Sequence, residues 1–131
     1  MGKINNVILI DDDEINNFLS YRLIKKLGVA DHIYIFHNGL EAINYMQQLA
    51  YDSKICPELI LLDINMPVMD GYEFLKAFHN LTFKNKEAIK IITVTTSNRH
   101  EDFERMQKLG VECIFSKPLC KQKLEEIITS I

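Results

Sequence analysis

The sequence is short of the features that would indicate a membrane-spanning, disulfide-bonded or zinc-binding protein. No apolar run approaches the length of a bilayer-spanning helix, and the polar N-terminal start does not resemble a signal peptide. Cysteine is scarce and forms no C-x-x-C pair, since only Cys56, Cys113 and Cys120 occur, and the histidines lack zinc-ligand spacing. We therefore expect reduced thiols, a cytoplasmic location and no membrane insertion.

A glycine-rich phosphate-binding loop is also missing, so no nucleotide site is apparent. The net charge of -3 argues against electrostatic binding of nucleic acid over the whole chain, and we expect no direct nucleic-acid binding. With 131 residues, 47% of them hydrophobic and 25% charged, the composition fits one globular domain. We expect a single domain over residues 1–131 with no output domain.

Short apolar runs alternate with segments of helical periodicity. One amphipathic stripe is expected from Ile15, Phe18, Leu19, Leu23 and Leu27, and another from Leu124 to Ile131. Asp13, Asn38 and Asn98 stand where helix N-caps are needed. The apolar runs are continuous, as in parallel strands covered on both faces, and comprise Val7–Ile10, Ile33–Phe36, Leu59–Leu62, Ile91–Val94 and Cys113–Phe115.

This alternation predicts an α/β fold in which a strand–helix unit occurs five times, a doubly wound five-stranded parallel sheet with strand order 2-1-3-4-5. Ligands of such sheets bind at the carboxyl ends of the strands. Four strands end in polar residues there, namely Asp11–Glu14, Asp63, Thr95–Ser97 and Ser116–Pro118. The second strand offers nothing obviously reactive, as expected for an edge strand.

The chemistry of these strand ends indicates phosphoryl transfer. Carboxylates gathered in one cleft repel each other unless a cation neutralises them, and oxygen ligands with room for water favour Mg²⁺. A site with Mg²⁺, the Lys117 ammonium and the Thr95 hydroxyl is suited to a transferring phosphoryl group. Without a nucleotide site, the group must go onto the protein, and the central carboxylate, Asp63, is the available nucleophile.

The stretch Leu61–Gly71 resembles the phosphoacceptor segment of two-component response regulator receiver domains, the CheY-like superfamily, nearly position for position. The acidic pair, the Thr95 strand end and Lys117-Pro118 occur in that family's order, and the resemblance covers essentially the whole chain. It implies a flavodoxin-like fold and a stand-alone signalling switch in phosphorelay signal transduction rather than a turnover enzyme. The implied partners are a sensor histidine kinase or histidine phosphotransferase and an unknown output protein.

The resemblance also implies individual roles. Asp63 would be the phosphoacceptor, while Lys117 and Thr95 would each contact a phosphoryl oxygen. Mg²⁺ would be held by Asp12, Asp63 and the main-chain carbonyl of Asn65, with Asp11 acting through a metal-bound water. A cis peptide is expected between Lys117 and Pro118, and Met66, Pro67 and Gly71 would set the shape of the loop that follows the third strand.

One departure from the family concerns the switch. The family often places Tyr or Phe three residues before its lysine, and Ile114 stands there in this chain. Phe115 is one residue off and is expected to point to the opposite face of the strand. The usual coupling between the threonine and an aromatic side chain is therefore in question.

Three other functions share part of this pattern. A relay shuttle that passes the phosphoryl group on to a histidine phosphotransferase would use the same residues. A haloacid-dehalogenase-like, Mg²⁺-dependent phosphatase would need an acid where Asn65 stands and an added cap segment. A flavodoxin-like electron carrier shares the architecture, but Asp11, Asp12 and Asp13 would repel the flavin phosphate.

Overall fold

The computed structural model describes residues 4–51, 57–66, 68–82, 86–111 and 113–130. Strands and helices alternate along the chain, and a single turn of 3-10 helix, Lys86–Ala88, precedes the fourth strand. The strands are β1 (Ile4–Ile10), β2 (Ala30–Phe36), β3 (Leu59–Leu62), β4 (Lys90–Thr95) and β5 (Cys113–Ser116). The helices are α1 (Glu14–Leu27), α2 (Gly39–Tyr51), α3 (Gly71–Asn80), α4 (His100–Lys108) and α5 (Lys121–Thr129).

The strands form one parallel sheet in the order β2-β1-β3-β4-β5, which confirms the predicted fold class and strand order. All four residues of β3, at the centre of the sheet, are buried. The continuous apolar runs of the sequence arise because helices cover both faces of such a sheet.

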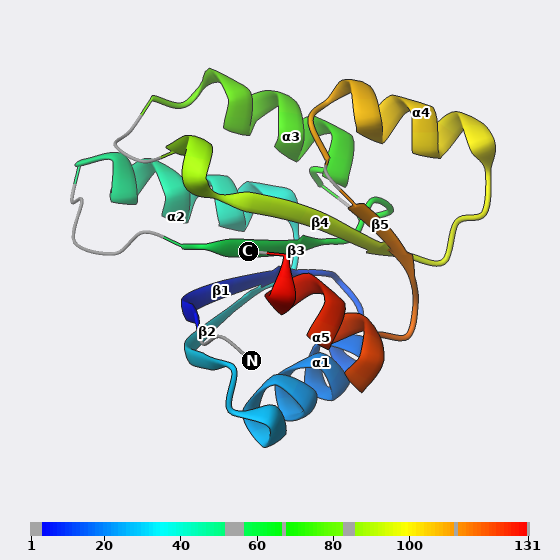
Figure 1. Cartoon of the computed structure of the whole chain (residues 1–131). Helices are drawn as coiled ribbons and strands as arrows, with labels where there is room; N and C mark the ends of the chain where they lie inside the picture. The colour runs from blue at the N-terminus through cyan, green and yellow to red at the C-terminus, as the bar shows by residue number, and fades with distance from the viewer. Residues whose placement is uncertain (1–3, 52–56, 67, 83–85, 112, 131) are drawn as a thin grey trace.

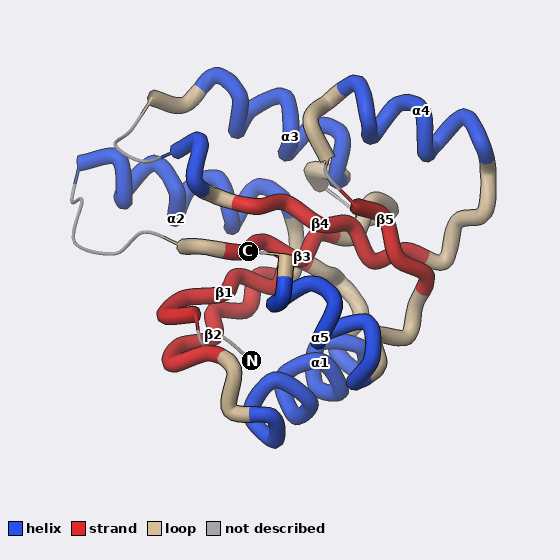
Figure 2. Tube along the Cα trace, viewed as in Figure 1, coloured by secondary structure: helices blue, strands red, loops and turns tan. Residues whose placement is uncertain are grey.

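Helices cover both faces of the sheet (Figures 1 and 2), and a hydrophobic core lies on each face. Helices α2, α3 and α4 cover one face, where Met46, Phe74 and Met106 are fully buried. Helices α1 and α5 cover the other face, where Ile24 and Leu124 are fully buried. The molecule is therefore a three-layered sandwich whose carboxyl strand ends all point to one edge.

Local capping holds the helices that start at this edge. Asp13 accepts hydrogen bonds from the backbone N–H groups of Ile15 and Asn16, and Asn38 accepts one from Glu41, so both predicted caps are confirmed. The prediction for Asn98 was wrong: the N-cap of α4 is Arg99, and its side chain forms no capping hydrogen bond. The first amide hydrogen bonds of this loop go to Ser97 and Thr95 instead.

The stripe predicted for α1 was wrong in its first half. Ile15, Phe18 and Leu19 are 73%, 57% and 50% exposed, whereas Asn17 and Ser20 are buried beside Ile24. Leu23 and Leu27, at the end of the stripe, do pack against the core. Helical periodicity identified an apolar face correctly, but the N-terminal half of α1 turns that face outward.

Within the described residues, no helix is long and apolar enough to cross a membrane. Cys113 and Cys120 are free cysteines, and both are exposed. Cys56 lies outside the described residues.

Candidate phosphoacceptor site

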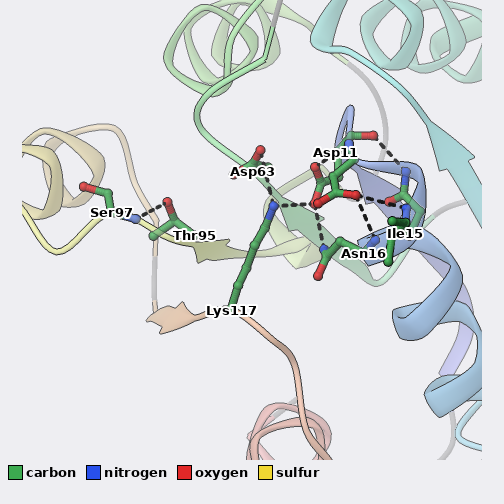
Figure 3. A network of polar contacts seen from close by, with 9 residues as sticks. Asp11, Ile15, Asn16, Asp63, Thr95, Ser97 and Lys117 are labelled. Atoms are coloured by element: carbon green, nitrogen blue, oxygen red, sulfur yellow. Dashed lines mark hydrogen bonds and ion pairs between the residues drawn. The ribbon is translucent and has the colours of Figure 1, made fainter.

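The polar residues that were expected to converge do so at the carboxyl edge of the sheet. Asp11 follows β1, Asp63 follows β3, Thr95 ends β4 and Lys117 follows β5, and Figure 3 shows Lys117 reaching between the two aspartates. The Lys117 Nζ lies 2.7 Å from Asp11 Oδ2 and 3.5 Å from Asp63 Oδ2. Parallel strands bring these residues together although they are far apart in sequence.

Three carboxylates gather at this edge. Asp11, Asp12 and Asp63 can each place one oxygen within 4.8 Å of the others, and Asp11 and Asp63 are buried while Asp12 is exposed. Burial, followed by the negative charge of Asp11, raises the pKa of Asp63 to about 6. Such a cluster of oxygen ligands, carrying more negative charge than one lysine offsets, fits a hard divalent cation such as Mg²⁺.

Lys117 is the counter-charge within this cluster. Its side chain is only 12% exposed, and burial by itself lowers its pKa. The hydrogen bond to Asp11 and the charge of Asp63 outweigh that effect and hold the pKa of Lys117 above its usual range. The ammonium is therefore charged at neutral pH and lies within reach of any anion on Asp63.

Two asparagines that the sequence analysis missed hold Asp11 from α1. Asn16 Nδ2 donates to Asp11 Oδ2 at 2.7 Å, and Asn17 Nδ2 donates to the Asp11 carbonyl at 2.8 Å. Asn17 and Ser20 also line a cavity of about 20 Å³ behind Asp11 and Asp63. These polar contacts turn Asn17 and Ser20 inward, which agrees with the exposure of Ile15, Phe18 and Leu19 in the first half of the predicted stripe. The detectable signal was a pair of amides two and three residues after the acidic run Asp11–Glu14.

The loop after β3 approaches α3 closely. A Cβ on Gly71 would lie 2.6 Å from the carbonyl oxygen of Asp63, so only glycine fits without displacing the backbone that carries Asp63. Met66 is buried, and Asn65, two residues after Asp63, is exposed. Pro67 lies outside the described residues.

Thr95 lies at the edge of the site, but its hydroxyl contacts the loop that follows β4. Its side chain is buried, and Oγ1 accepts a hydrogen bond from the backbone N–H of Ser97 at 3.1 Å. The expected cis peptide between Lys117 and Pro118 is present. Among the described residues, no hydrogen bond joins the Thr95 side chain to Asp63 or Lys117 (Figure 3).

The two candidate switch residues on β5 point to opposite faces, as predicted. Ile114 packs against the core beneath α3 and α4, whereas Phe115 packs against the core beneath α1 and α5. Phe115 therefore cannot replace an aromatic side chain at the position of Ile114 without a shift of register.

Comparison with known families identifies the domain. Residues 7–129 match the response regulator receiver domain. The chain belongs to this family. Receiver domains are signalling switches of two-component systems and are generally not turnover enzymes, so the family and phosphorelay signalling inferred from the motifs are confirmed.

Solved structures and relatives similar to this chain are also response regulators. A two-component response regulator from Cytophaga hutchinsonii is 29% identical, with a TM-score of 0.87 over 98% of this chain and 96% of that chain. Response regulator Rcp1 of Synechocystis sp. is 28% identical over 95% of this chain and 84% of its own length. The structure of its Mn²⁺-bound form has a TM-score of 0.74 and covers 97% of this chain and 91% of that one.

The receiver fold also occurs inside much larger proteins. Hybrid signal transduction histidine kinase B of Dictyostelium discoideum is 30% identical over 89% of this chain, which spans only 6% of that kinase. Receiver domains thus occur among both response regulators and histidine kinases.

Proposed function

We propose that this receiver domain accepts a phosphoryl group on the Asp63 carboxylate from the phosphohistidine of a histidine kinase or histidine phosphotransferase, in a Mg²⁺-dependent manner. The observation that carries the proposal is the placement of Lys117, 2.7 Å from Asp11 and 3.5 Å from a buried Asp63. A bond forms between Asp63 Oδ and phosphorus as the phosphorus–nitrogen bond of the donor breaks, and the imidazole leaves with the electron pair of that bond.

The remaining residues have supporting roles. Lys117 contacts one phosphoryl oxygen, and the Thr95 hydroxyl donates to another after turning from Ser97. Asp12 and Asp63, which lie in the same carboxylate cluster as Asp11, would hold the metal together with the main-chain carbonyl of Asn65, and Asp11 would act through a metal-bound water. When bound, Mg²⁺ supplies positive charge to the phosphoryl oxygens.

The two neighbouring acids should differ in metal binding. Asp11 already accepts hydrogen bonds from Asn16 and from the Asp13 amide and pairs with Lys117, whereas Asp12 is exposed and has no side-chain partner among the described residues. We expect Asp12→Ala to weaken Mg²⁺ binding by about 100-fold and Asp11→Ala by about tenfold, measured by calorimetric titration.

Asp13→Ala is the matched control, because it removes the same charge from the same segment but only a helix cap. It should leave the Mg²⁺ affinity within about threefold of the wild type. A larger loss for Asp11→Ala than for Asp12→Ala would reverse the assigned roles.

The outward apolar face of α1 suggests where the phosphodonor protein lies. Ile15, Phe18 and Leu19 are exposed on a helix that begins directly after the acidic cluster, and Val68, also exposed, follows Asp63 by five residues. A protein that brings a phosphohistidine to Asp63 must cover this rim, and burial of apolar side chains would stabilise that complex.

Phe18→Asp should therefore slow phosphoryl transfer from a donor protein without affecting transfer from a small-molecule donor. We expect the rate of transfer from a phosphorylated histidine phosphotransferase domain to fall by at least about tenfold, since a charge would enter the interface. Labelling by acetyl phosphate, measured by intact mass, should be unchanged. Leu40→Asp, at another exposed apolar position on α2, is the control and should affect neither reaction. Equal transfer rates for Phe18→Asp and the wild type would place the donor elsewhere.

A further inference from the structure

A chain of hydrogen bonds leads from Thr95 away from the phosphoacceptor to α3. The Ser97 backbone N–H donates to Thr95 Oγ1, and the Ser97 hydroxyl donates to Asp102 Oδ2 at 2.5 Å. The Tyr72 hydroxyl donates to the other carboxylate oxygen, Asp102 Oδ1, at 2.8 Å. Figure 3 shows the first link, at the end of β4. The chain thus joins the edge of the site to α4 and, across α4, to α3.

Helix α4 depends on such polar contacts for its position. Met106 is its single fully buried residue, whereas α3 buries five. Asp102 receives both hydroxyls, and the Arg105 guanidinium lies 3.7 Å from the centre of the Tyr72 ring. A helix with so little apolar anchorage can change position if these contacts change.

A second contact between α3 and the end of α4 lies two turns away. The His79 ring nitrogen Nε2 lies 2.6 Å from the Leu109 carbonyl oxygen. Tyr72 and His79 are seven residues apart on α3, as Asp102 and Leu109 are along α4, so the two contacts join corresponding levels of neighbouring helices. Of these two contacts, the one at Asp102 is linked to Thr95, through Ser97. Loss of that contact would free the N-terminal end of α4 while its C-terminal end stays held.

The protonation states suit the network at neutral pH. Hydrogen bonds from Ser97 and then Tyr72 hold the pKa of Asp102 below its usual range. Burial, followed by the hydrogen bond to Asp102, raises the pKa of Tyr72 to about 12. The carboxylate is therefore ionised and the phenol keeps the proton that it donates.

We propose that Asp102 and Tyr72 are positioning residues for Thr95. Acting through Ser97, they hold the loop after Thr95 and the N-terminal end of α4 in the unphosphorylated arrangement. Phosphorylation of Asp63 releases the loop and the end of α4 together. The inference rests on the proposed phosphorylation of Asp63. In many family members an aromatic side chain couples the threonine to the output surface. Ile114 stands at that position here, packs against the core beneath α4 and has neither a ring nor a hydroxyl. The inference assigns this coupling to the polar network instead.

The release follows from competition for Thr95. When its hydroxyl turns to donate to a phosphoryl oxygen on Asp63, Oγ1 no longer faces the Ser97 amide, and the loop that presents the Ser97 hydroxyl to Asp102 must rearrange. The network therefore favours one of two states, as a switch requires. By reciprocity, weakening the network must strengthen binding of a phosphoryl mimic at Asp63.

Tyr72→Phe tests this because it removes one hydroxyl and keeps the ring beneath Arg105. We expect beryllofluoride, in the presence of Mg²⁺, to bind the variant about threefold to tenfold more tightly than the wild type, by ¹⁹F NMR titration. Without the mimic, amide hydrogen exchange in residues 100–105 should already be faster than in the wild type, with a smaller change near Leu109. Tyr21→Phe removes an exposed hydroxyl on α1 and should change neither measurement.

Asp102→Asn is the second variant, because it keeps the shape but weakens both hydrogen bonds, and it should also bind beryllofluoride more tightly. A merely structural role predicts lower thermal stability with unchanged or weaker binding, and that result in both variants would overturn the inference. If the wild type neither binds beryllofluoride nor takes a label from acetyl phosphate, the proposed phosphorylation of Asp63 fails and the inference falls with it. If the wild type does both and the variants behave like it, only the inference is wrong.

Discussion

Asp63→Asn is expected to abolish phosphorylation of the receiver domain while leaving its fold intact. The amide has the same size as the carboxylate but is too weak a nucleophile to attack phosphorus. After incubation with acetyl phosphate and Mg²⁺, the wild type should gain the mass of one phosphoryl group, and the variant should gain none.

Asp31→Asn is the matched control, since it makes the same chemical change at an exposed position on β2, away from the carboxyl edge, and should be labelled like the wild type. Stable label on the Asp63→Asn variant would show that another residue is the acceptor.

The same substitution should stabilise the metal-free protein at neutral pH. Burial and the charge of Asp11 raise the pKa of Asp63 to about 6, above its value in the unfolded chain, so the ionised carboxylate destabilises the folded state at pH 7. Protonation of Asp63 in the folded state removes this penalty as the pH falls through 6 toward 4. In EDTA, Asp63→Asn should therefore raise the free energy of unfolding by about 1–3 kcal/mol at pH 7 and by little at pH 4. Denaturant unfolding at the two pH values measures this, and equal gains at both would contradict it.

Lys117→Met should have the largest effect on stability. The substitution keeps an apolar stem of similar length but removes the cation from between Asp11 and Asp63, whose carboxylates are buried. Breaking a buried ion pair leaves uncompensated charge, and we expect the free energy of unfolding to fall by about 2–4 kcal/mol at pH 7 in EDTA. Added Mg²⁺ should restore part of this loss, because a cation bound by the same carboxylates offsets the same repulsion.

Labelling of Lys117→Met by acetyl phosphate should also slow by at least about 100-fold, since the phosphoryl oxygens lose a pre-positioned positive charge. The matched control is Lys121→Met, which removes an exposed lysine paired with Glu125 at 3.9 Å. That pair contributes little, so its loss should change the unfolding free energy by less than about 0.5 kcal/mol. Comparable destabilisation by the two substitutions would mean that Lys117 does not neutralise the carboxylate cluster.

The fold and the composition of the site were predictable from sequence because both follow from periodicity and chain order. Continuous apolar runs between helical segments predict a parallel sheet covered on both faces, and β3, with all four residues buried, is the clearest case. The carboxyl ends of parallel strands share one edge, so Asp11, Asp63, Thr95 and Lys117 had to meet there once the strand order was known.

The rotation of α1 was not predictable in this way. Periodicity identifies the apolar face of a helix, but the inward face is chosen by all the contacts that the helix makes. In α1, Asn17 faces inward and donates to the Asp11 carbonyl, Ser20 is buried beside a small cavity, and Ile15 and Phe18 are exposed. A local pattern cannot reveal such a choice, because the partners lie on other elements.

Only the tertiary structure determined which polar side chains pair with each other in the site and in the network that joins α4 to α3. Lys117 lies closer to Asp11 than to Asp63, and no sequence pattern predicts this difference. Tyr72 and Asp102 are 30 residues apart and belong to no recognisable motif, yet their hydrogen bond joins α3 to α4. The sequence by itself determined the sheet and the edge at which Asp11, Asp63, Thr95 and Lys117 gather, since these depend on periodicity and strand order. The side-chain pairings depend on distances of a few ångströms between helices, which are set only when both layers pack against the sheet.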